Sequence, residues 1–530
     1  MRVAVVGGGP GGLFAATLVK ASDPNRQVTV FERNRAEDTF GFGVVFSDAT
    51  LEGIHAADPV LRTALSAHGV HWDPIEVRLH GEQFFCRGNG MAAVQRRTLL
   101  QLMQQRALQA GVDVRFSIEV DPDELLTAGY ELVVAADGAN SGLRRQFADA
   151  LCPEADTAKT KFIWLGTTYT FTGLTFIHQR GPHGVFAVHG YPIGNGISTF
   201  IVETDEQSWR SAGLDEFDVA QPPGPSDEKT RAYLQALFAD QIDGHPLLVN
   251  NSRWSSFCTR RTRRWWERVD TTAIALLGDA AHTAHFSVGS GTKMAMEDAV
   301  ALVAALDAHP ADVEAALAAY ETARRPQVDK IQRSAQPSLA WWEHFGRYHD
   351  TLPAWQFAYH FFTRSLPESK LRRRDAAFVD AVHRRWRQAH GAEPLHSPIE
   401  VAGRHLDGRI VPVGSGEARL SGAAIPLRQG PTGDGSAWGL QVTAPDRDDD
   451  LSAALDTVAA GVAAGAALVA VCGGTALTRR LVCEAARLEH GAVSLLLEAV
   501  EPARAEDVAV TAVLSGRTDL VGIPVEREAW

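Results

Sequence analysis

The glycine-rich turn near the start of the chain constrains the fold more than any other feature of the sequence. The stretch VAVVGGGPGGLFAATLVKA opens with β-branched residues, turns at glycines and continues as an Ala-rich helical pattern. Gly7, Gly9 and Gly12 match G-x-G-x-x-G, in which the first glycine permits the turn, the second lets backbone approach a pyrophosphate and the third lets helix and strand pack closely. A second expected strand ends in Glu32, about 20 residues later, the spacing of a ribose-binding acid. The pattern predicts a Rossmann-like dinucleotide-binding domain.

Two later strand ends indicate which dinucleotide binds. ELVVAADGANSGLRRQF ends a β-run at Asp137 and Gly138, and LLGDAAHTAHFSVGSG ends another at Asp279, before a helix that begins near 289–292. An NAD dehydrogenase needs neither acid, whereas the ribityl chain of FAD offers hydroxyls to a carboxylate. We therefore expect Asp279 to bind that chain, and the helix to direct N–H groups at the flavin ring. In the alternative interpretation Asp279 only caps a helix and the glycines form an ordinary loop.

The composition of the chain argues against several classes of binding partner. The chain has 530 residues, enough for two or three domains, and its net charge of -13 disfavours nucleic acid and anionic membranes as partners. Its five cysteines form no C-x-x-C pair and no metal-type spacing, so we expect reduced thiols and no metal site. No apolar run is long enough to cross a bilayer, and the N-terminus lacks a cleavable signal. These features predict a cytoplasmic protein.

The motifs, taken in order, resemble those of the single-component FAD aromatic hydroxylases, which have the para-hydroxybenzoate hydroxylase fold. In that family an arginine at the start of a helix also contacts FAD, and QRRTLLQLM matches with Arg96, with Arg97 as its neighbour. His285-Phe286 replaces the family's usual proline pair, and Lys293 replaces its usual asparagine. Motifs and resemblance together assign FAD binding to Gly7, Gly9, Gly12, Glu32, Arg33, Arg96, Asp137, Gly138, Asp279, Gly289, Gly291 and Thr292.

Longer runs are similar to a narrower group, which contains salicylyl-CoA 5-hydroxylase and 2-aminobenzoyl-CoA monooxygenase. These runs are FGFGVVFSDATL, GDAAHTAHFSVGSGTKMAMEDAVAL and RSAQPSLAWWEHFGRY, and the resemblance covers nearly all of residues 1–390. It implies hydroxylation of an ortho-substituted benzoyl-CoA, foremost salicylyl-CoA to gentisyl-CoA, with NADH or NADPH and O2 as co-substrates. The alternatives are 2-aminobenzoyl-CoA or a free aromatic intermediate as substrate, and a non-catalytic flavin-binding interaction protein. The assembly state is left open, with a homodimer as one option.

The fold class we expect is α/β, with an antiparallel sheet inserted into the FAD-binding domain. Alternating apolar and polar residues between 160 and 205 predict that sheet, which would roof the active site. The expected boundaries are 1–160 and 255–390 for the FAD-binding domain with its C-terminal helices, 161–254 for the sheet domain, 391–400 for a linker and 401–530 for a small C-terminal α/β domain.

His285 is the candidate catalytic side chain, since the preceding motif places it near the flavin ring. Its imidazole is expected to hold or deprotonate the ortho substituent of the substrate, with a packing role as the equal alternative. Phe286 and, by resemblance, Val44, Val45 and Phe46 are expected to wall the pocket. Two basic runs, RRTRRWWER at 260–268 and KLRRRD at 370–375, are either solvated surface or contacts for CoA phosphates.

The C-terminal third has a separate resemblance. GRHLDGRIVPVG and LSGRTDLVGIPVEREAW are similar to the opening and closing segments of an Old Yellow Enzyme-type FMN barrel. A full (β/α)₈ barrel takes about 250 residues and this segment has only about 130. We therefore expect part of a β/α barrel, with a structural role, no FMN, and Arg517 exposed to solvent.

Overall fold

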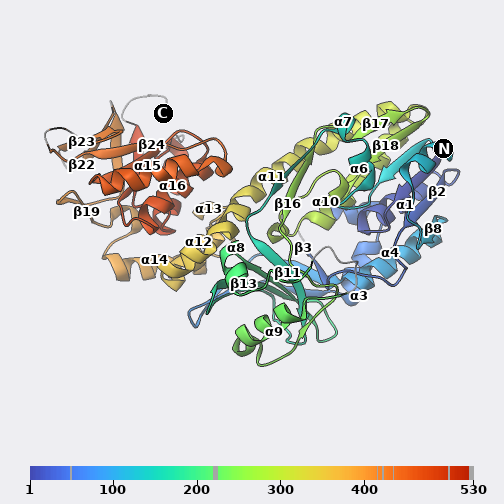
Figure 1. The fold of residues 1–530 in the computed structure, drawn as a ribbon, viewed down its shortest axis with the longest axis horizontal. Coiled ribbons are helices and arrows are strands. Elements are labelled where there is room, and N and C mark those ends of the chain that lie inside the picture. Colours follow the sequence, from blue (N-terminus) through green and yellow to red (C-terminus); the bar gives the residue numbers. More distant parts are fainter. Residues whose placement is uncertain are drawn as a thin grey trace. The chain divides into compact units, whose positions relative to one another are not determined.

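The computed structural model describes residues 1–47, 51–218, 225–414, 416–420, 423–431, 433, 435–498 and 502–524. The chain forms two compact units (Figure 1). The first contains residues 1–78 and 89–343, and the second contains residues 79–88 and 344–530. The end of the sequence segment that resembles a closing barrel strand, 525–530, lies outside the described residues.

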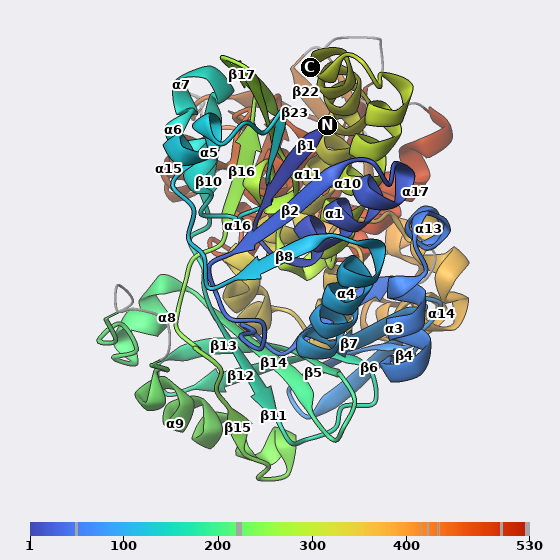
Figure 2. The same cartoon turned by 90° about the vertical axis from the view of Figure 1, so that its right-hand side faces the viewer.

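The first unit is built on a largely parallel sheet with the strand order β17-β18-β9-β1-β2-β8 (Figure 2). These strands are β1 (Arg2–Val6), β2 (Gln27–Glu32), β8 (Asp113–Phe116), β9 (Leu132–Ala135), β17 (Trp266–Val269) and β18 (Thr272–Leu276). β1 pairs in parallel with β2 and β9, and β17 runs antiparallel to β18. Helix α1 (Pro10–Ser22) packs against α4 (Arg96–Ala110) and α10 (Gly291–Ala308). Val3 and Val5 of β1 are fully buried in this core and Val6 is partly buried, which explains the β-branched run in the sequence.

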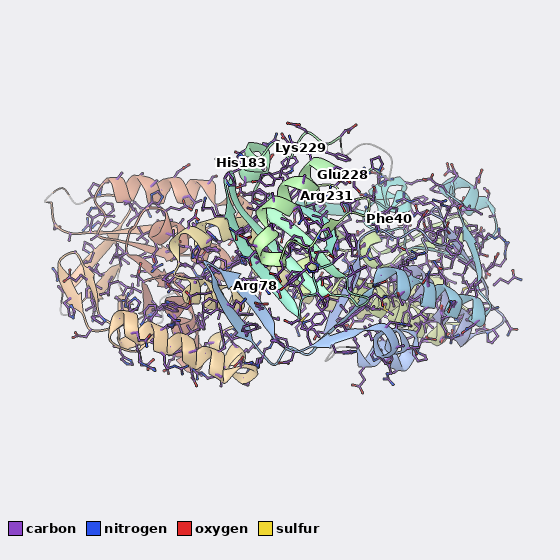
Figure 3. All side chains as sticks on the ribbon, turned by 90° about the horizontal axis from the view of Figure 1, so that it is seen from below. Phe40, Arg78, His183, Glu228, Lys229 and Arg231 are labelled. Atoms are coloured by element: carbon purple, nitrogen blue, oxygen red, sulfur yellow. The ribbon has the colours of Figure 1, made fainter. Side chains whose placement is uncertain are left out.

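A second, mostly antiparallel sheet is inserted into the first unit, in the order β15-β11-β14-β13-β12-β5. Its strands are β5 (Ile75–Leu79), β11 (Lys161–Thr167), β12 (Leu174–Gly181), β13 (Gly184–Pro192), β14 (Ser198–Thr204) and β15 (Leu247–Leu248), with α8 (Glu206–Ser211) and α9 (Glu228–Leu237) beside them. Val188 and Val202 pair across β13 and β14 and lie in the core beneath α9. His189 and Ile201, the adjacent pair, therefore point to the opposite face. On the α9 side, Lys229 and Arg231 are surface cations paired with Glu216 and Glu228 (Figure 3).

A three-stranded sheet packs against that opposite face. It has the order β3-β7-β4, and its strands are β3 (Gly43–Ser47), β7 (Met91–Gln95) and β4 (Val70–Trp72). Helices α2 (Glu52–Ala57) and α3 (Val60–His68) lie between β3 and β4 in the sequence. Trp72, Tyr191 and Ile201 share a small core between the two sheets. The remaining elements of this unit are β10 (Pro153–Thr157), β16 (Cys258–Thr262), α5 (Pro122–Thr127), α6 (Gly142–Gln146), α7 (Ala148–Leu151), η2 (Ala239–Ile242), η3 (Gly278–Ala280) and η4 (Phe286–Val288). Helix α11 (Val313–Thr351) continues from this unit into the next.

The second unit ends in a small closed barrel of order β21-β22-β23-β24-β25-β26-β27. Its strands are β21 (Ile410–Gly414), β22 (Glu417–Leu420), β23 (Ala423–Arg428), β24 (Gly439–Thr443), β25 (Leu468–Cys472), β26 (Ser494–Leu497) and β27 (Leu520–Pro524), with α15 (Ser452–Ala463), α16 (Ala476–Leu488) and α17 (Pro502–Leu514) between the later ones. β27 pairs in parallel with β21, which closes the ring. The expectation of a small C-terminal α/β domain is confirmed, and the sequence did not show that seven strands close it into a barrel.

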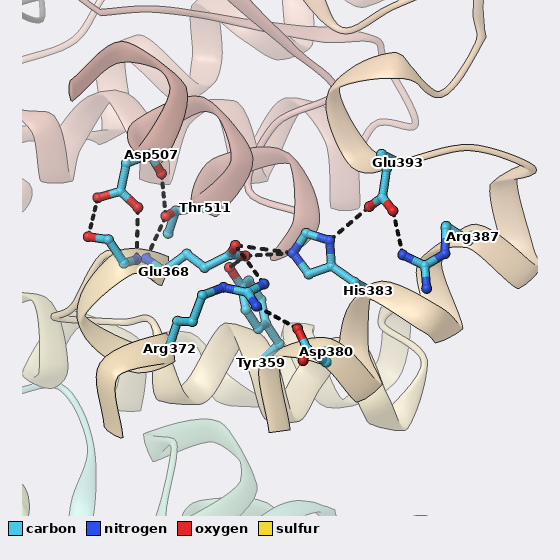
Figure 4. Close-up of polar contacts among 10 residues, drawn as sticks. Tyr359, Glu368, Arg372, Asp380, His383, Arg387, Glu393, Asp507 and Thr511 are labelled. Carbon is cyan, nitrogen blue, oxygen red and sulfur yellow. Dashed lines mark hydrogen bonds and ion pairs between the residues drawn. The ribbon is translucent and has the colours of Figure 1, made fainter. Parts of the chain in front are cut away.

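Helices α12 (Ala354–Phe362), α13 (Glu368–Arg374) and α14 (Ala376–His390), with η5 (Pro394–His396), precede the barrel, together with the strands β6 (Glu82–Cys86), β19 (Ile399–Val401) and β20 (Arg404–Leu406). The carboxylate of Glu368 joins three of the helices (Figure 4). It accepts a hydrogen bond from the hydroxyl of Tyr359 at 2.7 Å and lies 2.9 Å from Nε2 of His383. Its backbone N–H donates to the hydroxyl of Thr511 on α17 at 2.9 Å. A buried polar cluster thus fastens α12, α13 and α14 to the barrel's last helix.

Arg517 is buried, which corrects the expectation that it is exposed. Only 4% of its surface is accessible, because the helical part of the same unit supplies its partners. It donates to the hydroxyl of Thr363 at 2.9 Å and to the carbonyl of His360 at 2.8 Å, and its Nε lies 3.4 Å from Glu484. Burial lowers the pKa of its guanidinium to about 10. Within the described part of the chain, no helix has the length and apolar character that a bilayer crossing needs.

Candidate active site

The turn between β1 and α1 has the geometry that its glycines predict. Gly7 adopts φ +107°, and a Cβ there would lie 2.3 Å from the carbonyl oxygen of Ala136. A Cβ on Gly12 would lie 2.1 Å from the carbonyl oxygen of Gly7. A Cβ on Gly9 would meet no protein atom within 4 Å, although Gly9 stands at the N-terminus of α1. The first and third glycines are therefore required by the fold, whereas the second leaves room for an anionic group.

Glu32 ends β2 beside this turn. One carboxylate oxygen accepts a hydrogen bond from the backbone N–H of Gly8 at 2.7 Å. The other accepts from the backbone of Asn34 at 2.8 Å and from its side chain at 2.6 Å. These bonds fix the carboxylate at the mouth of the glycine turn, where a ribose would follow a pyrophosphate. The neighbouring Arg33 is exposed.

Asp279 and Arg96 come together from distant parts of the sequence. Asp279 lies in η3 after β18 and has an exposed side chain, yet its surroundings are dense enough that burial raises its pKa, against the lowering effect of His282 and Arg96. Arg96 is the first residue of α4, and burial lowers its pKa, opposed by Tyr191 and Asp279. Its Nε is buried and has no hydrogen-bond partner among the described residues. The pair thus offers a carboxylate and an unsatisfied guanidinium Nε to a ligand.

Asp137 lies two residues after the end of β9, and only one of its two carboxylate oxygens has a hydrogen-bond partner among the described residues. Its Oδ2 accepts a hydrogen bond from the backbone N–H of Gly142 at 2.8 Å, and its Oδ1 is buried without a partner in the described part of the chain. Next to it, a Cβ on Gly138 would meet no atom within 4 Å. Buried carboxylate oxygens are normally satisfied, so this one is a candidate ligand contact.

Asp298 positions the loop that carries Asp279, and the sequence interpretation missed it. Its carboxylate accepts from the backbone N–H of Gly278 at 3.0 Å and lies 2.8 Å from Nε2 of His282. Nε of Arg324 donates to it at 2.8 Å. Burial alone would raise the pKa of Asp298, but the cationic neighbours outweigh burial and lower it. In the sequence Asp298 is an ordinary acid within a helical pattern, so only the packing of α10 on the turn reveals its role.

His285 lies beneath the inserted sheet and is 1% exposed. Its Nδ1 is 2.7 Å from the hydroxyl of Ser287, and its Nε2 is 3.3 Å from Oε1 of Glu203 on β14. The other oxygen of Glu203 lies 2.6 Å from Nε2 of His189 on β13. Burial would raise the pKa of Glu203, but the two histidines overcome that effect and lower it to about 2. Both ring nitrogens of His285 thus face protein groups, which favours a role through its neighbours.

Aromatic rings surround Phe286, which follows His285. The ring centroids of Phe162, Trp164 and His189 lie 4.9, 5.9 and 5.3 Å from that of Phe286. Val45 belongs to the same small core, and a Cβ on Gly289 would lie 3.6 Å from it. The loop after Asp279 therefore meets β3 at Val45. Gly291 and Thr292 form the first turn of α10 immediately beyond this contact.

Phe46, expected in the pocket wall, packs elsewhere. It is 1% exposed and belongs to the main core of the first unit, as does Val44. Successive side chains of a strand point to opposite faces, so Val45 faces the inserted sheet while its two neighbours face away. The expectation for Phe46 and Val44 is corrected on this ground.

The basic run at 260–268 is engaged in ion pairs. Arg263 pairs with Glu154 at 2.7 Å, and Arg264 pairs with Glu267 at 3.0 Å. In the run at 370–375, Arg372 pairs with Asp380 (Figure 4). These ion pairs give some arginines of each basic run a partner within the protein. They do not support the interpretation that the runs bind the phosphates of CoA.

Comparison with known proteins identifies the family to which the chain belongs. A family profile described as FAD binding domain matches residues 1–335. A salicyloyl-CoA 5-hydroxylase from Streptomyces sp is 57% identical over 98% of this chain and 99% of its own length. The chain belongs to the FAD-binding-domain family of flavin-dependent aromatic hydroxylases. A 3-hydroxy-4-methyl-anthranilyl-[aryl-carrier protein] 5-monooxygenase from Streptosporangium sibiricum is 37% identical over 64% of this chain and 89% of its own length.

Among solved structures, P. aeruginosa PqsL in complex with 2-aminobenzoylacetate superposes with a TM-score of 0.50 at 23% identity, covering 66% of this chain and 98% of that one. This likeness concerns the fold, and it confirms the expected architecture of a Rossmann-like domain with an inserted antiparallel sheet. The residues of the site also fit FAD: the space at Gly9, the unsatisfied Arg96 Nε and the unsatisfied Asp137 Oδ1 are what a bound dinucleotide would use.

Proposed function

We propose that this enzyme hydroxylates salicyloyl-CoA at ring position 5, para to the phenol, using bound FAD, NADH as reductant and O2. The observation that carries the proposal is the 57% identity to a salicyloyl-CoA 5-hydroxylase, which extends over 98% of this chain and 99% of the relative. NADPH is the alternative reductant. A cytoplasmic location belongs to the same proposal, since NADH and acyl-CoA thioesters are cytoplasmic metabolites.

In this proposal the residues at the strand ends hold FAD. The N–H groups at the start of α1 bind the pyrophosphate, and Glu32 binds the adenosine ribose. Asp279 accepts hydrogen bonds from the ribityl hydroxyls, with Arg96 and Asp137 as further polar contacts. The remaining FAD contacts in this proposal are Gly7, Gly9, Gly12, Arg33, Gly138, Gly289, Gly291 and Thr292.

FAD supplies the activation of oxygen, and the chain's own residues supply orientation and exclusion of water. The apolar wall formed by Phe286, Val45, Phe162 and Trp164 holds a planar ring and keeps water from it. The CoA part of the substrate contributes binding energy remote from the ring, which orients it for reaction.

The test is turnover by the purified holoenzyme. NADH oxidation, oxygen uptake and product are measured with salicyloyl-CoA, 2-aminobenzoyl-CoA and free salicylate, and the position of the new hydroxyl is read by NMR. The proposal expects salicyloyl-CoA to give the highest kcat/KM and a product hydroxylated para to the phenol. Equal rates with free salicylate would contradict the thioester assignment, and faster turnover of 2-aminobenzoyl-CoA would reassign the substrate.

A further inference from the structure

The inserted sheet turns one face toward the candidate active site, and its pairing register places Trp164 on that face. Trp164 on β11 pairs with Ile201 on β14, and Ile201 pairs with His189 on β13. Directly paired residues of neighbouring strands point to the same face of a sheet, so the three side chains lie in one row. The ring centroid of Trp164 lies 5.9 Å from that of Phe286. Trp164 is therefore part of the wall against which the ring of the proposed substrate lies.

The indole N–H of Trp164 is a buried donor without an acceptor in the protein. Its Nε1 is shielded from solvent and has no hydrogen-bond partner among the described residues. An indole N–H can only donate, and a buried tryptophan normally finds an acceptor for it. Because burying such a donor unpaired is unfavourable, the N–H indicates an acceptor that belongs to a ligand.

A glycine segment beside the indole leaves this N–H uncovered. Gly41 has φ +74°, and a Cβ built there would have the indole as its nearest neighbour, with Cδ1 and Nε1 of Trp164 both at 3.7 Å. A longer side chain at this position would pack over the N–H. The side chain of Asn250 fixes the segment, because its Nδ2 donates to the carbonyls of Thr39 and Gly41 at 2.8 and 3.0 Å. The chain thus keeps the donor accessible to a ligand.

The neighbour of Gly41 on the N-terminal side, Phe40, reaches the surface. Its side chain is 38% exposed (Figure 3). The order Phe286, Trp164, Gly41, Phe40 therefore leads from the buried aromatic wall to solvent. An acyl-CoA needs such an exit, because its aromatic ring is small enough to be enclosed whereas the rest of the molecule is not.

We propose that Trp164 donates a hydrogen bond to the thioester carbonyl of the bound acyl-CoA, whose arm leaves the site past Gly41 and Phe40. This inference rests on the proposed function and adds a substrate contact to it. The carbonyl oxygen carries no proton, so it complements a group that can only donate. The contact holds the ring by its acyl group and leaves position 5, on the far half of the ring, free to react.

The experiment removes the N–H and measures binding separately from turnover. The oxidised holoenzymes of wild type and Trp164→Phe are titrated without NADH, and dissociation constants are read from the flavin spectrum. The ligands are salicyloyl-CoA and S-(2-hydroxybenzyl)-CoA, the thioether in which CH₂ replaces the carbonyl. Infrared spectra of bound salicyloyl-CoA, with and without ¹³C in the carbonyl, report the hydrogen bond at that oxygen.

Trp209→Phe is the matched control. The Nε1 of Trp209 is also buried without a partner among the described residues, but this indole packs against the core on the opposite face of the inserted sheet. The variant loses the same donor from the same domain at a position away from the proposed substrate.

We expect the wild type to bind the thioester about 10-fold more tightly than the thioether, and Trp164→Phe to lose that preference while its affinity for the thioether stays the same. The carbonyl stretch should move to higher frequency in Trp164→Phe, because a hydrogen bond to a carbonyl lowers it. Trp209→Phe should follow the wild type in both measurements.

Three results overturn the contact. These are a wild type that binds the two ligands alike, a carbonyl stretch that Trp164→Phe leaves unchanged, and a Trp164→Phe protein that loses affinity for FAD but not for salicyloyl-CoA. The first of them needs no variant, so it decides even if Trp164→Phe is less stable. Failure of the wild type to bind salicyloyl-CoA overturns the proposed function instead.

Discussion

Asp298 accepts a hydrogen bond from the backbone N–H of Gly278 at 3.0 Å, so helix α10 holds the turn that presents Asp279. The same carboxylate neutralises Arg324, which is 3% exposed. The flavin-side loop therefore depends on a buried ion pair as well as on its own backbone hydrogen bonds, such as that from the N–H of His282 to the carbonyl of Gly278 at 2.9 Å. This arrangement links the stability of the first unit to the position of a candidate FAD contact.

Asp298→Ala should unfold the first unit more easily and lower its FAD content. Removing one partner of a buried pair costs about 3–5 kcal/mol, and here it leaves Arg324 with Glu297, at 3.1 Å, as its remaining counter-ion. Urea unfolding and the 450 nm absorbance of the purified protein measure the two effects. Asp307→Asn removes an exposed partner of Arg26 and should cost less than about 1 kcal/mol. A similar loss in both variants would contradict the assigned role of Asp298.

Gly9→Ala should weaken FAD binding without affecting folding, whereas Gly12→Ala should lower the stability of the fold. A methyl group on Gly12 collides with the carbonyl oxygen of Gly7, so that variant should lose about 1–3 kcal/mol of stability. A methyl group on Gly9 meets no protein atom within 4 Å, and its backbone is extended with φ -73°, so the apoprotein should unfold as the wild type does. FAD affinity should nevertheless fall, as titration of the apoprotein would measure. Unaltered FAD affinity in Gly9→Ala would place the pyrophosphate elsewhere.

Asp279→Ala should weaken FAD binding while leaving the fold in place. Hydrogen bonds to a charged group contribute about 1.5–3 kcal/mol, which corresponds to roughly 10- to 150-fold in affinity. Equilibrium titration of the apoprotein measures this change, and circular dichroism checks the fold. Asp279→Asn should recover part of the affinity because it keeps an acceptor oxygen. Isolation of Asp279→Ala with a full complement of tightly bound FAD would remove Asp279 from the site.

The His383 cluster should make the second unit less stable in alkali. Burial opposes protonation of His383, but Glu368 and Glu393 outweigh it and raise its pKa. A group whose pKa is raised on folding contributes its full stabilisation below its unfolded value of about 6.5, and that contribution is lost as the pH rises through the folded value. The melting temperature of the wild type should therefore fall between neutral and alkaline pH, more than that of His383→Gln. Parallel curves for the two proteins would contradict the assignment.

Protonation of Glu368 should make the same cluster less stable in acid. Burial raises its pKa, but hydrogen bonds from His383 and Tyr359 outweigh that effect and lower it. A carboxylate with a lowered pKa contributes fully above its unfolded value, about 4.3, and loses its contribution as the pH falls through the folded one. The cluster should therefore be most stable in weakly acid to neutral solution. Hydrogen exchange of α13 and α14 measured across pH would locate this window.

The nucleotide-binding half of the fold could be predicted because its signals are local. Gly7 is required by its φ of +107° in the turn, and Gly12 by its close approach to the carbonyl of Gly7, so their spacing is visible in the sequence. The orientation of Val45 and Phe46 could not be predicted from local sequence signals. Both suit a buried strand, and only the register against β7, which pairs Val45 with Ala93, decides which of the two faces the inserted sheet.

The polar groups of the site could not be predicted in the same way. Glu203 lies in an alternating strand pattern, and nothing nearby in the sequence indicates that two histidines from other segments will meet its carboxylate. Arg517 was expected at the surface because arginine is rarely buried without partners. Its partners, Glu484 and the carbonyl of His360, come from helices far away in the chain, and only the folded unit brings them together.

The pairing of β27 with β21 has a consequence for synthesis. A ribosome releases the chain from the N-terminus, so β21 emerges long before the strand that completes its ladder. Until then the nascent barrel has two open edges, at β21 and β26, and such edges readily pair with strands of other chains. Slow elongation or a stall in the last helix should therefore produce aggregated protein, while chaperones that shield exposed strands should raise the yield.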